Sequence, residues 1–102
     1  MKLMTKAIEK KLPKLYATEN IPHEEKIAIV KFFNPTGMGT WYGIEYDPES
    51  REFYGYVELY FPEFGYFSLT ELESLKLPYG LKIERDLYFK PTKVGEIMKE
   101  RI

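Results

Sequence analysis

The side chains that could support acid–base or nucleophilic catalysis are few and scattered along this chain. The only histidine, His23, lies in the polar stretch Pro22-His23-Glu24-Glu25, with no sequence pattern of a nucleophile beside it. A catalytic histidine needs a nucleophile and an orienting group close in space, so we interpret His23 as an ordinary surface residue. The chain has no cysteine, which excludes disulfides, zinc–thiolate sites, iron–sulfur clusters and thiol catalysis.

Carboxylates are the one reactive group in good supply. Glu45 with Asp47, and Glu58 with Glu63, have the chemistry to act as acid and base or to hold a cation, but no spacing matches a calcium-binding loop. A carboxylate-based enzyme would need a concave pocket holding two or more members of one set: Glu45, Glu58, Glu63 and Asp86. Because carboxylate pairs arise by chance in an acidic segment, we expect no catalytic residue, no metal and no cofactor.

Two short motifs have structural interpretations. Gly37-Met38-Gly39 is followed by a strand pattern and not by a helix, so it predicts a hairpin loop and not a phosphate cradle. Arg85 is expected to hold a carboxylate of the acidic middle of the chain, as an intramolecular latch, with a ligand contact as the alternative.

Charge is distributed unevenly along the 102 residues, although the formal net charge is only -1. Residues 1–40 and 76–102 each carry seven basic and four acidic side chains, whereas residues 41–75 carry one basic and eight acidic ones, a net charge of -7. Such a segment attracts basic partners and repels nucleic-acid phosphates. The alternative is that the two basic ends simply fold back over the acidic middle.

Hydrophobic spacing and turn residues predict an α+β fold for one domain of residues 1–102. Short helices are expected at 5–12, at 69–75 behind the capping box Ser68-Leu69-Thr70-Glu71, and near the C-terminus from about residue 91. Strands are expected at 26–33, 40–46 and 53–61, with a short fourth strand at 65–67. The connections are too short for parallel crossovers, so the sheet should be an antiparallel meander of three or four strands. The predicted core is Ile27, Ile29, Val30, Phe32, Ile44, Val57, Leu59, Leu72, Ile97 and Met98.

The strand at 53–61 has an unusual second face. Its side chains alternate between an apolar set, Phe53 to Phe61, and a set that is rich in tyrosine. We predict that this acidic, tyrosine-rich face stays uncovered and contacts a partner through Trp41, Tyr54, Tyr56, Glu58 and Tyr60. The alternative is that tyrosine simply suits a half-buried strand whose hydroxyl groups reach water.

Several segments occur in an order that is typical of one small bacterial family. They are Leu15-Tyr16-Ala17-Thr18-Glu19, Val30-Lys31-Phe32-Phe33, Trp41-Tyr42, Glu45-Tyr46-Asp47, Gly65-Tyr66-Phe67-Ser68-Leu69, Glu71-Leu72-Glu73 and Ile83-Glu84-Arg85-Asp86. Together they resemble the family described as domain of unknown function 2958, over nearly the whole chain. The resemblance implies a setting on plasmids and other mobile elements, and it brings no known activity or site.

We therefore predict a non-enzymatic binding or accessory module that contacts a protein partner or a second copy of itself. Mimicry of nucleic acid by aligned carboxylates is the second hypothesis. Binding of single-stranded nucleic acid by the tyrosines and the N-terminal lysines is the third, and the acidic middle disfavours it. The N-terminus has no apolar signal segment and no stretch is long enough to span a bilayer, so we expect a cytoplasmic protein without membrane contact.

Overall fold

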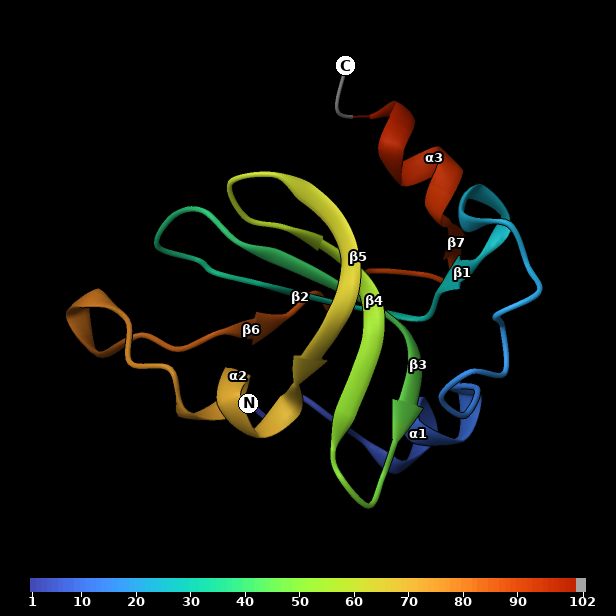
Figure 1. The fold of residues 1–102 in the computed structure, drawn as a ribbon. Coiled ribbons are helices and arrows are strands. Elements are labelled where there is room, and N and C mark those ends of the chain that lie inside the picture. The colour runs from blue at the N-terminus through green and yellow to red at the C-terminus, as the bar shows by residue number, and fades with distance from the viewer. Residues whose placement is uncertain (101–102) are drawn as a thin grey trace.

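A five-stranded antiparallel sheet forms the centre of the computed structural model, which describes residues 1–100 (Figure 1). Its strand order is β5-β4-β3-β2-β6, so β2 to β5 form the predicted meander, and β6 pairs with β2 from a distant part of the sequence. The strands are β2 (Val30–Phe33), β3 (Thr40–Asp47), β4 (Glu52–Glu58), β5 (Pro62–Ser68) and β6 (Glu84–Arg85). The α+β class is confirmed, but the expected three or four strands were too few.

Shorter elements surround this sheet. A separate two-stranded sheet pairs β1 (Ile27–Ala28) with β7 (Thr92–Lys93). The described residues form three α-helices, α1 (Lys6–Lys11), α2 (Leu69–Ser74) and α3 (Val94–Lys99), and two 3-10 turns in the connections, η1 (His23–Glu25) and η2 (Pro78–Gly80). The predicted helix starts are confirmed for α1 and α2. The Thr5 hydroxyl accepts the Ile8 amide at 3.1 Å and the Ser68 hydroxyl accepts the Glu71 amide at 3.2 Å.

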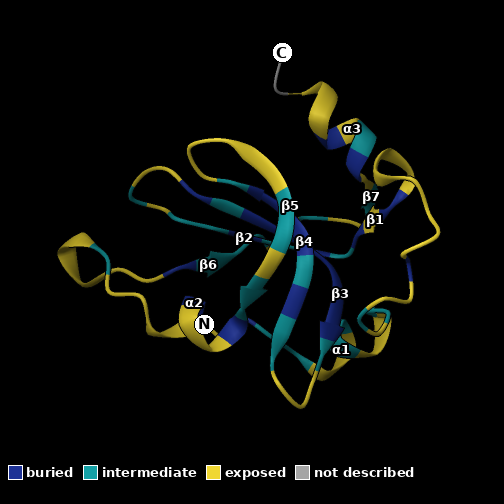
Figure 2. Ribbon diagram, in the orientation of Figure 1, coloured by how far each residue is buried: buried dark blue, intermediate teal, exposed yellow. Residues whose placement is uncertain are grey.

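Each face of the sheet contributes to a buried core of its own, under a different cover (Figure 2). One face, here called the α2 face, packs under α2, the N-terminal segment and Ile83, and its sheet residues are Val30, Phe32, Trp41, Tyr46, Phe53 and Val57. The other face, the α3 face, packs under α3 and β1, and its sheet residues are Tyr42, Ile44 and Tyr56. The two terminal segments thus cover opposite faces of one sheet.

Two predicted strands have different limits in the structure. The segment 26–33 is interrupted at Ile29, because β1 leaves the large sheet to pair with β7, and this turns Ile27 outward. The third predicted strand ends at Glu58, and the turn that follows carries Leu59, Tyr60 and Phe61 into solvent. The short fourth strand expected at 65–67 is longer in the structure, because β5 begins at Pro62 and has seven residues.

Candidate functional site

A row of three side chains crosses the α3 face from the edge of the sheet toward its middle. The strand registers place Glu45 of β3 opposite Tyr54 of β4, and Tyr54 opposite Tyr66 of β5. The register between β3 and β4 shifts between Gly43 and Glu45, which marks a β-bulge. A bulge adds one residue to a strand and re-aims the side chains beyond it. Glu45 therefore lies on the tyrosine side, and Tyr46 packs in the α2-face core.

The Glu45 carboxylate fastens the segment before η1 onto this face. Its Oε1 accepts the Tyr16 amide at 2.7 Å, and its Oε2 accepts the Thr18 amide at 2.9 Å and the Thr18 hydroxyl. The Nζ of Lys26 donates to the Thr18 carbonyl and, at 3.1 Å, to the Thr18 hydroxyl. Thr18 thus bridges a buried carboxylate and a buried lysine, which satisfies groups that are costly to bury alone.

These contacts hold Tyr16 in an unusual conformation. Its φ angle is 71°, in the left-handed region that costs most side chains free energy. The carboxylate of Glu45 holds the Tyr16 amide, and the Tyr16 hydroxyl shares a hydrogen bond with Tyr66. The strained turn therefore sets one wall of a cleft above the sheet.

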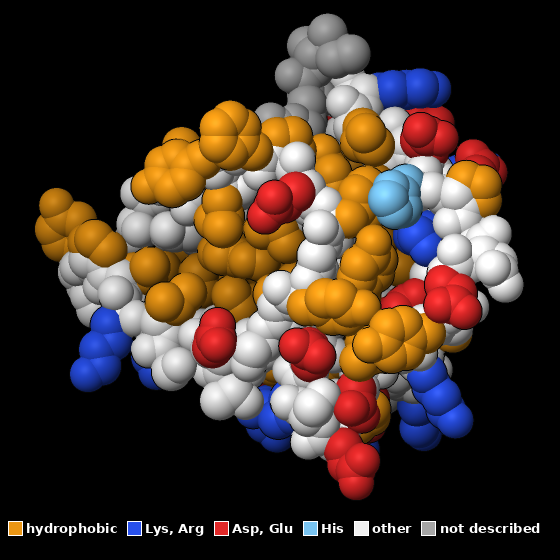
Figure 3. Space-filling view, viewed as in Figure 1, with side chains coloured by type: hydrophobic (Ala, Val, Ile, Leu, Met, Phe, Trp, Pro, Cys, Tyr) orange, Lys and Arg blue, Asp and Glu red, His pale blue; other side chains and the backbone are white. Residues whose placement is uncertain are grey.

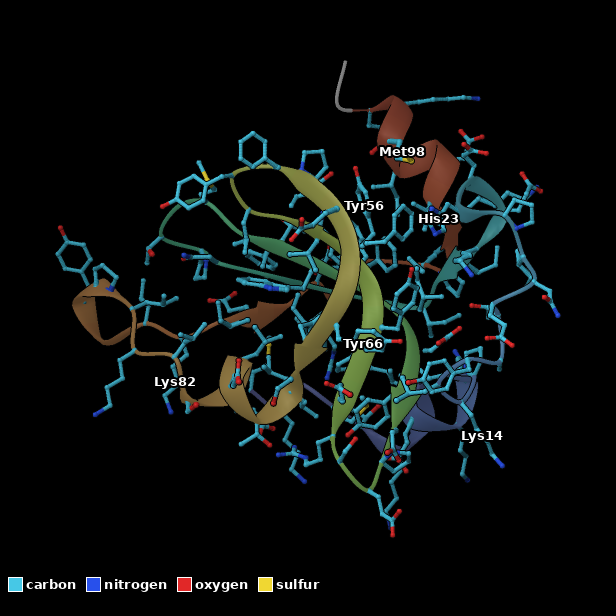
Figure 4. The ribbon with its side chains drawn as sticks, in the orientation of Figure 1. Lys14, His23, Tyr56, Tyr66, Lys82 and Met98 are labelled. Atoms are coloured by element: carbon cyan, nitrogen blue, oxygen red, sulfur yellow. The ribbon has the colours of Figure 1, made fainter. Side chains whose placement is uncertain are left out.

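The cleft has a volume of about 520 Å³, and its lining includes Tyr16, His23, Lys26, Glu45, Tyr54 and Tyr66. His23 lies at its edge, where the imidazole stacks on Phe64 with ring centroids 4.0 Å apart. Figure 4 shows His23 and Tyr66 on the same side of β5, facing the segment that precedes η1. The cleft therefore combines aromatic faces with the buried Glu45 carboxylate and Lys26 ammonium group and with the exposed side chains of Glu19 and His23.

Two tyrosines of the cleft are held in the protonated form. The hydrogen bond with Tyr16 raises the pKa of Tyr66 to about 12, with burial and the nearby Glu45 charge acting in the same direction. Burial, and then the charge of Glu45, raise the pKa of Tyr54. Both phenols are therefore neutral hydrogen-bonding groups at physiological pH. The Tyr54 ring already faces the Lys26 ammonium, 5.9 Å from its centroid, whereas the ring of Tyr66 is exposed and can stack on a ligand.

The residues predicted for partner contact do not share one exposed face. Tyr56 is only 2% exposed in the α3-face core, and Trp41 is buried in the α2-face core on the opposite side of the sheet. Tyr54 is half-buried in the cleft, Glu58 ends β4, and Tyr60 is 85% exposed in the turn between β4 and β5. Alternation placed Tyr54 and Tyr56 on one face correctly, but α3 covers Tyr56 and the strand ends before Tyr60.

The carboxylates considered for catalysis are also separated. Only Glu45 of that set lines the cleft, while Asp86 lies beyond β6 and pairs with Lys31 at 3.7 Å. Glu63 pairs with Val57 and shares its face of the sheet, whereas Glu58, the next residue after Val57 on β4, points to the other face. Within residues 1–100, no three histidine, aspartate or glutamate side chains lie close enough to hold a metal ion.

Arg85 has a different role from the one predicted. Its guanidinium donates to the backbone carbonyls of Lys2, at 2.6 Å, and of Leu3, at 3.1 Å, and not to a carboxylate. This contact fixes the N-terminal segment so that Leu3 enters the α2-face core. The residue is a latch, as expected, but it holds the start of the chain.

Comparison with known proteins identifies the family to which the chain belongs. No curated protein and no solved structure matches the chain. None of the helices within residues 1–100 combines the length and the apolar composition that a membrane span requires. The model of the DUF2958 family, described as a protein of unknown function, matches residues 3–96, which include every segment of the cleft. The chain therefore belongs to the DUF2958 family.

Proposed function

We propose that this chain is a non-enzymatic binding module that contacts a protein partner through the cleft and the adjoining strand β5. The observation that carries the proposal is the row Glu45–Tyr54–Tyr66, which connects an open sheet edge to a cleft already shaped by buried hydrogen bonds. Tyrosine supplies large contact area at low entropic cost, and it is enriched at protein interfaces.

The chemistry of the cleft favours binding over turnover. Both oxygens of Glu45 are occupied by hydrogen bonds to Tyr16 and Thr18, so the carboxylate anchors the cleft wall. Lys26 is likewise engaged by Thr18, and its Nζ lies 5.9 Å from the centroid of the Tyr54 ring. The accessible lining combines aromatic surface, above all Tyr16, which is 62% exposed, and Tyr66, which is 49% exposed, with the exposed side chains of Glu19 and His23.

Site-specific photocrosslinking in the native cell tests this proposal. A photoreactive benzoylphenylalanine replaces Tyr66, and a matched variant carries it in place of Tyr79, which is 96% exposed on η2. We expect a discrete protein adduct from position 66 and none from position 79. Adducts of the same proteins from both positions, or none from position 66, would count against a partner surface at the cleft.

A further inference from the structure

The outer edge of β5 has unpaired backbone groups. The Leu69 amide donates to the Arg51 carbonyl at 2.9 Å, at the end of the β4–β5 ladder. Hydrogen-bonded pairs alternate with non-bonded pairs in an antiparallel ladder, so Glu63, Gly65 and Phe67 bond to β4. The amide and carbonyl groups of Phe64 and Tyr66 then point away from the sheet, and they have no hydrogen-bond partner among residues 1–100.

No other strand pairs with this edge in the described part of the chain, and Pro62, Glu63 and Tyr66 of β5 are exposed. β5 is the last strand on its side of the sheet, and Pro62, which has no amide hydrogen, occupies a position whose amide would point outward. Figure 3 looks onto the edge: the backbone of β5 runs between hydrophobic side chains on its two sides, and the surface on the α2 side is hollowed. An exposed edge of this kind is a template for another strand.

A row of glycines on the α2 face shows what an added strand would contribute. Gly43, Gly55 and Gly65 are in register across β3, β4 and β5. The ring of Phe53, from β4, lies over Gly43, and the ring of Phe67, from β5, lies over Gly55. Gly43 and Gly55 are thus each covered by an aromatic ring from the next strand toward the edge.

Gly65 breaks this pattern because no strand follows β5. A side chain built there would meet nothing within 4 Å, whereas one at Gly55 would meet the Tyr42 carbonyl oxygen at 1.9 Å. The open space above Gly65 is called the notch below. It lies over Gly65 where the ring of Phe53 lies over Gly43 and the ring of Phe67 lies over Gly55.

The charge around the edge of β5 favours a basic segment over a second copy of this chain as the added strand. Glu63 lies on the α2 side of β5, and Glu19 and Glu45 line the cleft on its other side. Figure 3 shows acidic side chains on both sides of this strand, with most lysines and arginines at the periphery. A second copy paired along β5 would bring two such acidic surfaces together, which is unfavourable. A basic segment is attracted to the same surface.

We infer that β5 binds an extended basic segment of a partner protein by strand addition, with an aromatic side chain of that segment seated over Gly65. The inference deepens the proposed function and rests on it. Alternate residues of the added strand point to opposite faces. Its apolar residues thus face the α2-side hollow, and its basic residues face Tyr66 and the cleft.

A heptapeptide with blocked ends, in which arginine alternates with valine, phenylalanine and valine (RVRFRVR), provides the probe. Calorimetry measures its affinity, and hydrogen exchange followed by NMR measures each amide of the chain. We expect binding that slows exchange of the Phe64 and Tyr66 amides. Affinity should fall at least tenfold when the central phenylalanine becomes alanine, and when glutamate replaces every arginine.

Gly65→Leu provides the matched change in the protein. The notch is open and Gly65 is extended, so the variant should fold, with amide exchange in β4 unchanged, yet bind RVRFRVR at least tenfold more weakly. Gly65→Ala, which fills less of the notch, should lose less affinity.

Four results would overturn strand addition. They are no binding of RVRFRVR, binding without protection of Phe64 and Tyr66, undiminished binding to Gly65→Leu, and a dimer of the free chain in sedimentation that protects these amides. If one of these results is found and the benzoylphenylalanine at position 66 still gives a protein adduct, strand addition is wrong but the proposed partner surface at the cleft is retained.

Discussion

Replacement of Glu45 by alanine should destabilise the protein more than any other change of one carboxylate. Glu45 is 3% exposed, and its two oxygens accept the amides of Tyr16 and Thr18 and the Thr18 hydroxyl. Each hydrogen bond to a charged acceptor contributes about 1.5–3 kcal/mol, and breaking a buried charged cluster typically costs about 3–5 kcal/mol. We therefore expect Glu45→Ala to lower the free energy of unfolding by about 4 kcal/mol.

The conservative variant separates charge from hydrogen bonding. In Glu45→Gln the amide oxygen still accepts from Thr18, but the NH2 group faces the Tyr16 amide, so one strong hydrogen bond is lost, at a cost of about 2 kcal/mol. Glu49→Ala, an exposed carboxylate in the β3–β4 turn, is the control and should change stability by less than about 0.5 kcal/mol.

Urea denaturation followed by the fluorescence of Trp41, the only tryptophan, measures these free energies. Limited trypsin digestion adds a local readout, since Lys14 is exposed at the start of the segment that Glu45 holds (Figure 4). Cleavage after Lys14 should become faster in Glu45→Ala. A loss below about 1 kcal/mol, with unchanged cleavage, would refute the anchoring role of this carboxylate.

Three further predictions follow from the same geometry. Gly55→Ala should lower the free energy of unfolding by about 3 kcal/mol, because the added Cβ would collide with the Tyr42 carbonyl oxygen. Gly65→Ala, where the space is open, should leave the free energy of unfolding unchanged or raise it by about 0.5 kcal/mol. Equal losses for the two variants in urea denaturation would contradict this contrast. Burial raises the pKa of Tyr42 to about 12, against about 10 in an unfolded chain, so its contribution to stability is complete below pH 10 and is lost as the pH rises toward 12. Tyr42→Phe should flatten that alkaline loss, and an unchanged pH profile would exclude Tyr42 as its source. Ser68→Ala should cost about 1 kcal/mol by removing the cap of α2, and a thermal midpoint equal to the wild type would refute the cap.

Local sequence signals predicted much of the fold. The capping residues Thr5 and Ser68 identified α1 and α2, because a cap acts within one helical turn. The meander from β2 to β5 followed from alternation and short connections. β6 and the β1–β7 pair were missed because two-residue strands carry no periodicity and exist only through pairing with distant segments.

The candidate site was harder to predict. Tyr54 was identified, but its neighbours in the cleft come from segments far apart in the sequence. The bulge after Gly43 also places Glu45 on the tyrosine side of the sheet, whereas simple alternation along the strand predicts the opposite face. Lys26 was missed because nothing local indicates that a lysine at a strand start becomes buried by bonding Thr18. The exposure of Tyr56 was misjudged because it depends on the packing of α3, whereas Tyr60 is exposed as expected but lies beyond the end of β4.

Amide exchange along β5 in the free protein tests the central claim most directly. The amides of Gly65 and Phe67, which bond to β4, should exchange slowly, and those of Phe64 and Tyr66 between them should exchange nearly as fast as in an unfolded chain. Uniform protection of all four amides in the monomer would show that the edge is covered, and it would contradict a surface that is free to receive a partner.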